Sequence, residues 1–144
     1  MKEKMSFTGK LDIYLKDANG VLVDEQHVHN LVVNVGKAWI ISRMVASSDP
    51  FMDYMAIGTN NTAPTNLDTA LQNEVARVSS STSSASNQVM YTGVFGAGVG
   101  TGVIVEAGIF NAASVGTMLA RSTALTVNKG PTDTLTIVWT VTAN

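Results

Sequence analysis

The sequence predicts a mainly β protein: a two-sheet antiparallel β-sandwich of jelly-roll-like form with one short α-helix. Three observations indicate this fold class. From Glu74 onward, apolar and polar residues alternate in short runs that clusters of Gly, Ser, Asn or Pro separate. Only 14% of the residues are charged, while Ser, Thr, Asn and Gly are abundant, as in β-rich proteins with many turns. A single segment repeats its apolar residues at helical spacing.

The length of 144 residues fits one domain, 1–144, with residues 1–10 as a possible N-terminal arm. The first element expected is a β-hairpin in the stretch KLDIYLKDANGVLVDEQHVHNLVV. Its turn contains Asn19 and Gly20, and these residue types tolerate the positive φ angles of a tight hairpin turn. The flanking runs alternate, so each of them has one apolar face.

The helix is expected from Val35 to Ala46, because apolar residues recur there at helical spacing and the sequence SSDP follows. We expect Trp39 to dock this helix on a sheet. A short strand that ends at Ile57 follows, and then an irregular loop rich in Asn, Thr and Pro. A brief helical turn is expected within that loop at Leu67–Leu71.

Five strands are expected in the second half of the chain, and the Ser-rich stretch between the first two is expected to be an exposed strand end or hairpin tip. In the last strand, Trp139 shares its face with Leu135 and Ile137, which places it in the core or in a subunit interface. The five strands are expected within residues 74–84, 87–98, 102–112, 117–127 and 133–143.

The charge balance argues against several classes of partner. Nine basic and eleven acidic residues give a net charge of -2, and no basic cluster is present that would attract nucleic acid. The chain has no cysteine, so disulfides and thiolate metal sites are excluded. The opening segment lacks the apolar stretch of a secretory signal, and no run approaches the roughly 20 apolar residues of a membrane span. We therefore expect neither nucleic acid nor a membrane as partner.

Known catalytic patterns are not found in the sequence. The glycine-rich stretch GVFGAGVGTG is followed by a strand pattern, whereas a dinucleotide loop precedes a helix, so a hairpin connection is expected there. No Gly-x-Ser-x-Gly turn is present, and the acidic residues are scattered rather than paired. We expect no enzyme activity, no catalytic residue and no cofactor.

His27 and His29 are the only histidines, and their spacing puts both side chains on one face of a strand. Two histidines are too few for a complete metal site, which needs three or four ligands. Carboxylates from elsewhere, or symmetry copies at a trimer axis, would have to complete it. The prediction is an exposed histidine pair without metal.

Glu106 is in an unusual position for a charged residue, because it lies in the apolar run VIVEAGIF. Strand alternation predicts that it shares a face with Ile104 and Phe110, so that its carboxylate is partly buried and requires a partner. Arg77 and Arg121 both lie in neighbouring strand patterns and are candidates for a bidentate ion pair. We favour Arg121, because the segment between it and Glu106 can fold back as a hairpin, and we expect a structural role rather than that of a catalytic acid.

The chain contains, in order, the stretches YMAIGTNNTAPTNLDTALQNEVAR, EAGIFNA with the later MLAR, and DTLTIVWTVT. This arrangement resembles a family of small structural proteins of tailed bacteriophages, in which an IGTG-TAP-TDTAL loop, an EAG-FNA strand and a final L-W strand recur in the same order, and the similarity covers about residues 30–142. The chain departs from the family pattern at Asn60 and Asn61, where a further glycine is usual. The resemblance implies a virion component and supplies no catalytic residues. It fits proteins of the capsid surface as well as proteins of the tail.

These observations together predict a capsid decoration or cement protein that stabilises the shell by bridging capsomers. The expected partners are further copies of the chain, as a homotrimer, and the major capsid protein or another virion protein. The location expected is the capsid surface of the virion. A tail or fibre-base protein is the alternative, and a carbohydrate-binding or hydrolytic domain at the host surface is less favoured, because only 6% of the residues are aromatic.

Overall fold

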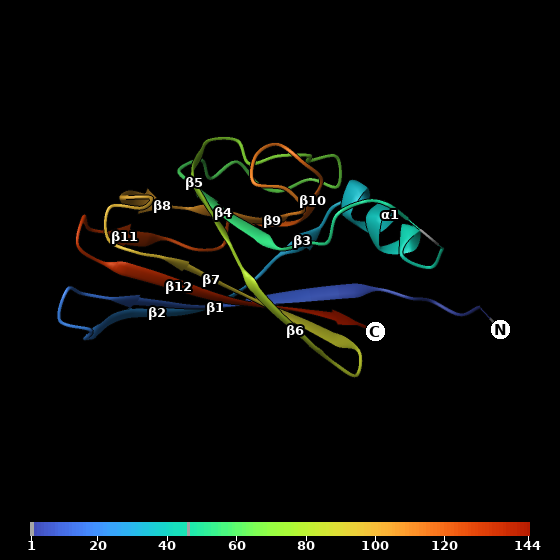
Figure 1. Ribbon diagram of the computed structural model, residues 1–144, viewed down its shortest axis with the longest axis horizontal. Coiled ribbons are helices and arrows are strands. Elements are labelled where there is room, and N and C mark those ends of the chain that lie inside the picture. The colour runs from blue at the N-terminus through green and yellow to red at the C-terminus, as the bar shows by residue number, and fades with distance from the viewer. Residues whose placement is uncertain (1, 46) are drawn as a thin grey trace.

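Two large antiparallel sheets make up most of the computed structural model, which describes residues 2–45 and 47–144 (Figure 1). The sheets form two layers, and the short helix α1 (Asn34–Ser42) lies at one end of the upper layer. The mainly β fold, with two sheets in a sandwich-like arrangement and one helix among the described residues, is confirmed.

Alternating strands give the first sheet one buried and one exposed face. Leu11 lies opposite Trp139 and Ile13 opposite Ile137 in the antiparallel register, and all four side chains are buried. The residues between them, Asp12 and Val138, lie on the opposite face and are partly exposed, as alternation along a strand predicts. The strand order is β2 (Leu22–His29), β1 (Phe7–Lys16), β12 (Thr134–Ala143), β7 (Gln88–Phe95) and β6 (Ser81–Ala85).

The second sheet is buried on both faces at its centre. Every residue of β9 and β10 is buried, because the first sheet covers one face while α1 and the loop 59–73 lie over the other. The helix comes so close that a Cβ added at Gly36 would lie 2.2 Å from the carbonyl oxygen of Leu119, so only glycine fits there. The strand order is β3 (Leu31–Val32), β10 (Met118–Ser122), β9 (Glu106–Phe110), β4 (Tyr54–Gly58) and β5 (Glu74–Ser79).

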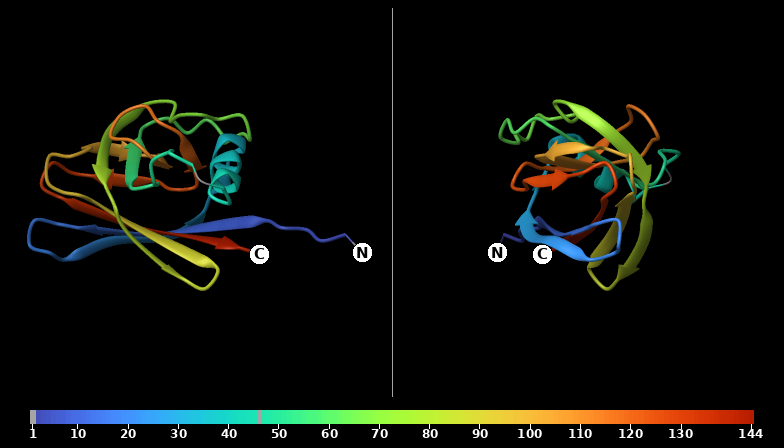
Figure 2. Two further views of the ribbon diagram at one scale, coloured as in Figure 1. Left: turned by 45° about the vertical axis from the view of Figure 1, so that its right-hand side comes forward. Right: turned by 90° about the vertical axis from the view of Figure 1, so that its left-hand side faces the viewer.

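The two sheets are joined at both sides by chain that passes from one layer to the other. The bend between β2 and β3 is at Asn30, and the bend between β5 and β6 is at Ser80. Figure 2 shows the second of these runs crossing between the layers. The run 74–84, expected as one strand, is therefore divided between two sheets, as strands at sandwich corners commonly are.

A two-stranded ribbon of β8 (Gly102–Ile104) and β11 (Val127–Lys129) extends the upper layer at the end opposite α1 (Figure 1). The glycine-rich stretch leads from β7 in the first sheet to β8 in this ribbon, and these strands are not neighbours. The predicted hairpin connection is therefore wrong. The runs 102–112 and 117–127 are each interrupted as well, because each contributes to the ribbon and to the second sheet.

The bounds of two predicted segments, the helix and the N-terminal arm, differ in the structure. The helix ends at Ser42, earlier than predicted, and the predicted end at Ala46 lies outside the described residues, as does Met1 of the predicted arm. The arm is also shorter than residues 1–10, because β1 begins at Phe7. Residues 2–5 are exposed and run outward from the body, which makes them a free extended segment (Figure 1).

Candidate functional site

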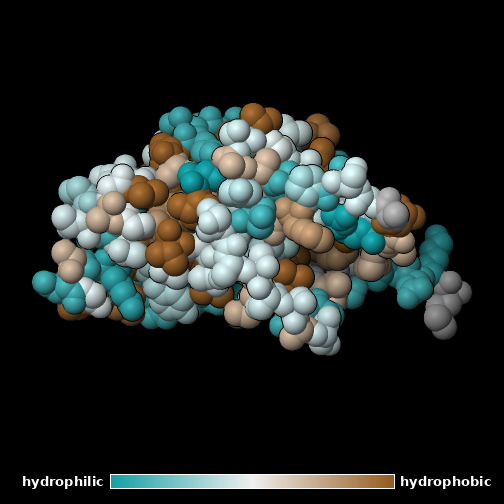
Figure 3. Space-filling view, in the orientation of Figure 1, coloured by the Kyte–Doolittle hydropathy of each residue, from teal (hydrophilic) through white to brown (hydrophobic). Residues whose placement is uncertain are grey.

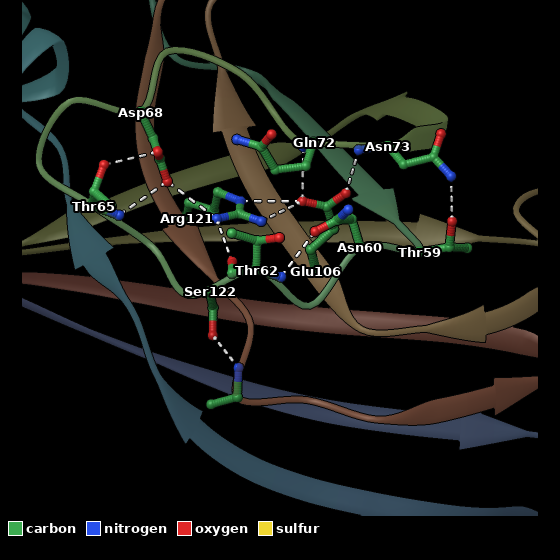
Figure 4. A network of polar contacts seen from close by, with 11 residues as sticks. Thr59, Asn60, Thr62, Thr65, Asp68, Gln72, Asn73, Glu106, Arg121 and Ser122 are labelled. Carbon is green, nitrogen blue, oxygen red and sulfur yellow. Dashed lines mark hydrogen bonds and ion pairs between the residues drawn. The ribbon is translucent and has the colours of Figure 1, made fainter.

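A buried ion pair lies between the second sheet and the loop 59–73 (Figure 4). Nη2 of Arg121 lies 2.8 Å from Oε2 of Glu106, and both side chains are 0% exposed. Nε of Arg121 donates to the same oxygen at 3.1 Å. The structure thus pairs Glu106 with Arg121, the predicted partner, although both hydrogen bonds from Arg121 end on the same carboxylate oxygen.

Two backbone N–H groups complete the surroundings of Glu106. Gln72 donates to Oε2 at 3.0 Å, and Asn73 donates to Oε1 at 2.7 Å. With the two donors from Arg121, the carboxylate accepts four hydrogen bonds, which is about its full capacity. Three of these hydrogen bonds end on Oε2 and one on Oε1, so the carboxylate is fixed between the strand and the loop and lies out of contact with water.

Asp68 and a loop carbonyl bind the other side of Arg121. Nη1 of Arg121 lies 3.1 Å from Oδ2 of Asp68 and 2.9 Å from the carbonyl oxygen of Thr62. Burial alone would raise the pKa of Asp68, but hydrogen bonds from Thr65 and from Arg121, together with the charge of Arg121, hold that pKa below its usual value. The helical turn predicted at Leu67–Leu71 is wrong, since the chain there forms turns and bends.

The local fold explains how a carboxylate comes to lie in this place. The segment between β9 and β10 turns back, so that these strands are antiparallel neighbours, as predicted. Alternation is broken at Val105, between β8 and β9, so Ile104 joins the main core while Glu106 faces outward under the loop. The prediction that both share a face is therefore wrong. Gly58 makes room for the carboxylate, because a Cβ there would lie 2.4 Å from Oε1 of Glu106.

Arg77, the other candidate for pairing with Glu106, fixes a different loop. It forms an ion pair with Glu74 at 2.6 Å and donates to the carbonyl oxygens of Ala112 and Val115, both at 2.9 Å. Its guanidinium carbon lies 3.8 Å from the centre of the Phe110 ring, which is a close cation–π contact. Arg77 thereby holds the loop between β9 and β10, as Arg121 holds the loop 59–73.

His27 and His29 are both exposed on β2. Nδ1 of His27 lies 2.6 Å from Asp12 and Nε2 lies 3.2 Å from Glu25. The hydrogen bond with Asp12 raises the pKa of His27 above its ordinary 6.5; desolvation opposes this in part, and the charge of Asp12 and the contact with Glu25 add to the rise. Among residues 2–45 and 47–144, no group of three or more His, Asp or Glu side chains is arranged to hold a metal ion.

The two tryptophans lie in different surroundings. Trp139 is 0% exposed in the main core, and its indole N–H donates to Oδ1 of Asn30 at 2.9 Å, which ties the core to one of the corners between the sheets. Trp39 is partly buried, packs against the same core from the helix, and donates to the carbonyl oxygen of Pro50 at 3.0 Å. Both positions agree with the sequence expectation.

Lys129 is a buried charged residue that the sequence reasoning missed. It is 2% exposed, and its Nζ donates to the carbonyl oxygen of Gly96 at 2.8 Å. Burial lowers the pKa of Lys129, and the nearby Asp133 charge offsets this only in part. The signal that could have identified it is its position two residues after Val127, on the same inward face of a strand.

The arrangement has the chemistry of a loop anchor: the Arg121 guanidinium binds the loop at Thr62 and Asp68, and the Glu106 carboxylate binds it at two further backbone N–H groups. Comparisons of the chain with protein-family models, curated proteins and solved structures found no match. Within the part of the chain that the structure describes, no helix is both long and apolar enough to span a bilayer.

Proposed function

We propose that this protein is a structural component of a bacteriophage virion, a capsid decoration or cement protein that bridges capsomers on the shell as a homotrimer. The resemblance of residues 30–142 to small phage structural proteins supports the proposal that the protein belongs to a phage particle. The observation that carries a contact role is a pair of rigidly anchored loops with exposed apolar tips, Leu67 and Val115, which are 81% and 83% exposed. Apolar groups held in fixed positions at the surface are typical of protein interfaces.

The anchoring of these tips is unusual for surface loops. Arg121 binds the loop of Leu67 through Thr62 and Asp68, and Arg77 binds the carbonyl oxygen of Val115 itself. Val115 has φ of 56°, a backbone conformation that costs a β-branched residue about 1–3 kcal/mol. A strained and exposed valine that hydrogen bonds hold in place favours a role in contact with a partner.

A hollow next to Val115 offers a place for a partner's side chain. Its volume is about 510 Å³, and Phe110, Arg77 and Glu74 contribute to its walls. An aromatic ring and an arginine beside apolar groups form the composition that is enriched at the energetic centres of interfaces. The face of the molecule in Figure 3 has apolar groups distributed among hydrophilic ones, and only 14% of the residues of the chain are charged, in keeping with a surface that binds more through shape than through charge.

The test is binding of the purified protein to phage shells that lack it, followed by electron microscopy to locate it on the particle. Leu67→Asp and Val115→Asp should each reduce the amount bound at least ten-fold, because they place a charge in an apolar contact. Ser83→Asp, on the exposed strand β6, is the matched control and should bind normally. Binding should change little with salt, since few charges are available for the contact.

Three results would contradict the proposal in different ways. Density for the protein at the tail or fibre base, with none on the shell, would move it to the tail-associated class. Equal binding by the wild type and both aspartate variants would show that the two loop tips are not the contact surface. Absence from the purified particle altogether would remove the virion assignment.

A further inference from the structure

The end of the sandwich that carries α1 opens into an apolar groove between the two layers. The groove has a volume of about 220 Å³, several times the roughly 30 Å³ that a water molecule takes up in the liquid. Burial in this wall raises the pKa of Tyr91 to about 12. Both sheets and the helix contribute to the lining, which includes Phe7, Trp39, Ile40, Val89, Tyr91 and Val141.

A cation and a further apolar side chain lie beside this groove. Phe51 is 73% exposed. Arg43, which also lines the groove, lies between the rings of Trp39 and Phe51 at 5.3 and 5.4 Å and donates to two backbone carbonyls. Among the residues that the structure describes, no carboxylate lies within ion-pair distance of Arg43. An acidic group beside an apolar one would complement this site.

The N-terminal arm carries an acidic and an apolar side chain close together. Residues 2–5 have the sequence KEKM, and Met5 is 57% exposed. In an extended segment Glu3 and Met5 point to one side, about 7 Å apart along the chain, and the two lysines point to the other. An arm that lies in the groove can therefore place Met5 in the apolar opening while Glu3 faces Arg43.

The start of β1 directs the arm away from the body of its own chain. Ser6 and Asn144 exchange two backbone hydrogen bonds, of 3.3 and 2.8 Å, and continue the pairing of β1 with β12. The arm therefore leaves along the direction of β1, and Figures 1 and 2 show it running away from the body. Four extended residues reach at most about 14 Å, which is enough to enter a molecule that abuts this end.

We propose that the N-terminal arm of one copy binds the apolar groove of a second copy, with Met5 inserted between the layers and Glu3 paired with Arg43. Arm and groove lie at the same end of the molecule. Copies that meet with this end around a rotation axis can thus each supply an arm and receive one, which closes the assembly. The inference rests on the proposed function only in requiring several copies of the chain, and it does not involve the shell.

Paired cysteines test this contact directly, because the natural chain contains none. One preparation carries Met5→Cys and a second, with a tag of different mass, carries Val89→Cys in the groove wall. After mixing and mild oxidation, a disulfide between the two differently tagged chains is expected. Lys4→Cys mixed with Val89→Cys is the matched control, since Lys4 points away from the groove, and it should cross-link at least five-fold less.

Association supplies a second measurement. Deletion of residues 2–5 and the substitution Glu3→Arg should both weaken self-association in sedimentation, the latter about two- to five-fold, as expected for an exposed ion pair. Lys4→Glu should leave it unchanged. The inference is overturned if the chain is monomeric at all concentrations, if Lys4→Cys cross-links as well as Met5→Cys, or if a Met5→Cys/Val89→Cys double variant cross-links only within one chain. Cross-linking between copies by a protein that does not bind shells would uphold this inference while refuting the proposed function.

Discussion

Substitution of Arg121 by methionine should destabilise the protein more than substitution of its partner Glu106 by glutamine. Without Arg121, the fully buried carboxylate of Glu106 and the nearly buried carboxylate of Asp68 lose their shared cation. An uncompensated buried charge of this kind costs about 3–5 kcal/mol. With Glu106→Gln, the guanidinium still pairs with Asp68 at 3.1 Å and binds Thr62, so the loss is mainly of hydrogen bonds, about 1–3 kcal/mol.

Urea unfolding followed by the fluorescence of buried Trp139 measures both effects. With a urea dependence of roughly 2 kcal/mol per molar, Arg121→Met should lower the unfolding midpoint by about 1.5–2.5 M, and Glu106→Gln by about 0.5–1.5 M. The exposed Lys37 provides a control, since Lys37→Met should change stability by no more than about 0.5 kcal/mol.

The double variant Glu106→Gln/Arg121→Met gives the sharpest comparison. If an unpaired buried carboxylate is what destabilises Arg121→Met, neutralising Glu106 in the same chain should raise the unfolding midpoint above that of Arg121→Met alone. The reasoning would be refuted if the losses of stability of the two single variants add up in the double variant. It would also be refuted if Glu106→Gln loses more stability than Arg121→Met.

Three further predictions follow from other residues. Trp139→Ala should cost about 3–5 kcal/mol, because the indole is fully buried, and urea unfolding followed by circular dichroism measures it without the tryptophan signal. Because the pKa of Asp68 is lowered on folding, its contribution is present above the ordinary value of 3.8 and is lost as pH falls through the lower folded value, so Asp68→Asn should remove that part of the acid destabilisation. Because the pKa of His27 is raised, its stabilisation is present below pH 6.5 and is lost as pH rises through the folded value; NMR titration should show the higher pKa, and Asp12→Asn should lower it.

The sequence predicted those elements whose signals lie within a few neighbouring residues. Asn19-Gly20 indicated the first hairpin, the spacing around Trp39 indicated the helix, and the alternation around Trp139 identified a core strand, because turn chemistry and period act within a few residues. The sequence does not reveal where a strand changes sheet. Asn30 and Ser80 are ordinary polar residues in continuous β patterns, and only the packing of the second layer makes them corners.

The ion pair of the candidate site could be predicted from the sequence, but the loop groups that bind it could not. A buried Glu106 requires a cation, and Arg121 lies on the next strand, which pairs with the strand of Glu106. The short separation of the two residues in the sequence was therefore enough to predict the ion pair. The backbone donors at Gln72 and Asn73 and the acceptor at Thr62 come from an irregular loop, whose path depends on the network itself. Strict alternation also failed at Val105, because leaving the ribbon for the second sheet shifts the register by one residue and reverses the faces.

The three arginines of the chain share one use, which explains how a protein without cysteine keeps long irregular loops in place. Arg121 binds the loop 59–73, Arg77 binds the loop between β9 and β10, and Arg43 binds the carbonyls of Ser47 and Asp49 after the helix. Each case uses the planar guanidinium to reach several oxygens at once, which a lysine ammonium on a flexible stem does less well. Because the side chains of two of the three arginines, Arg77 and Arg121, are thereby buried, little positive charge is exposed at the loop tips, and the contacts proposed there would depend on shape and apolar area.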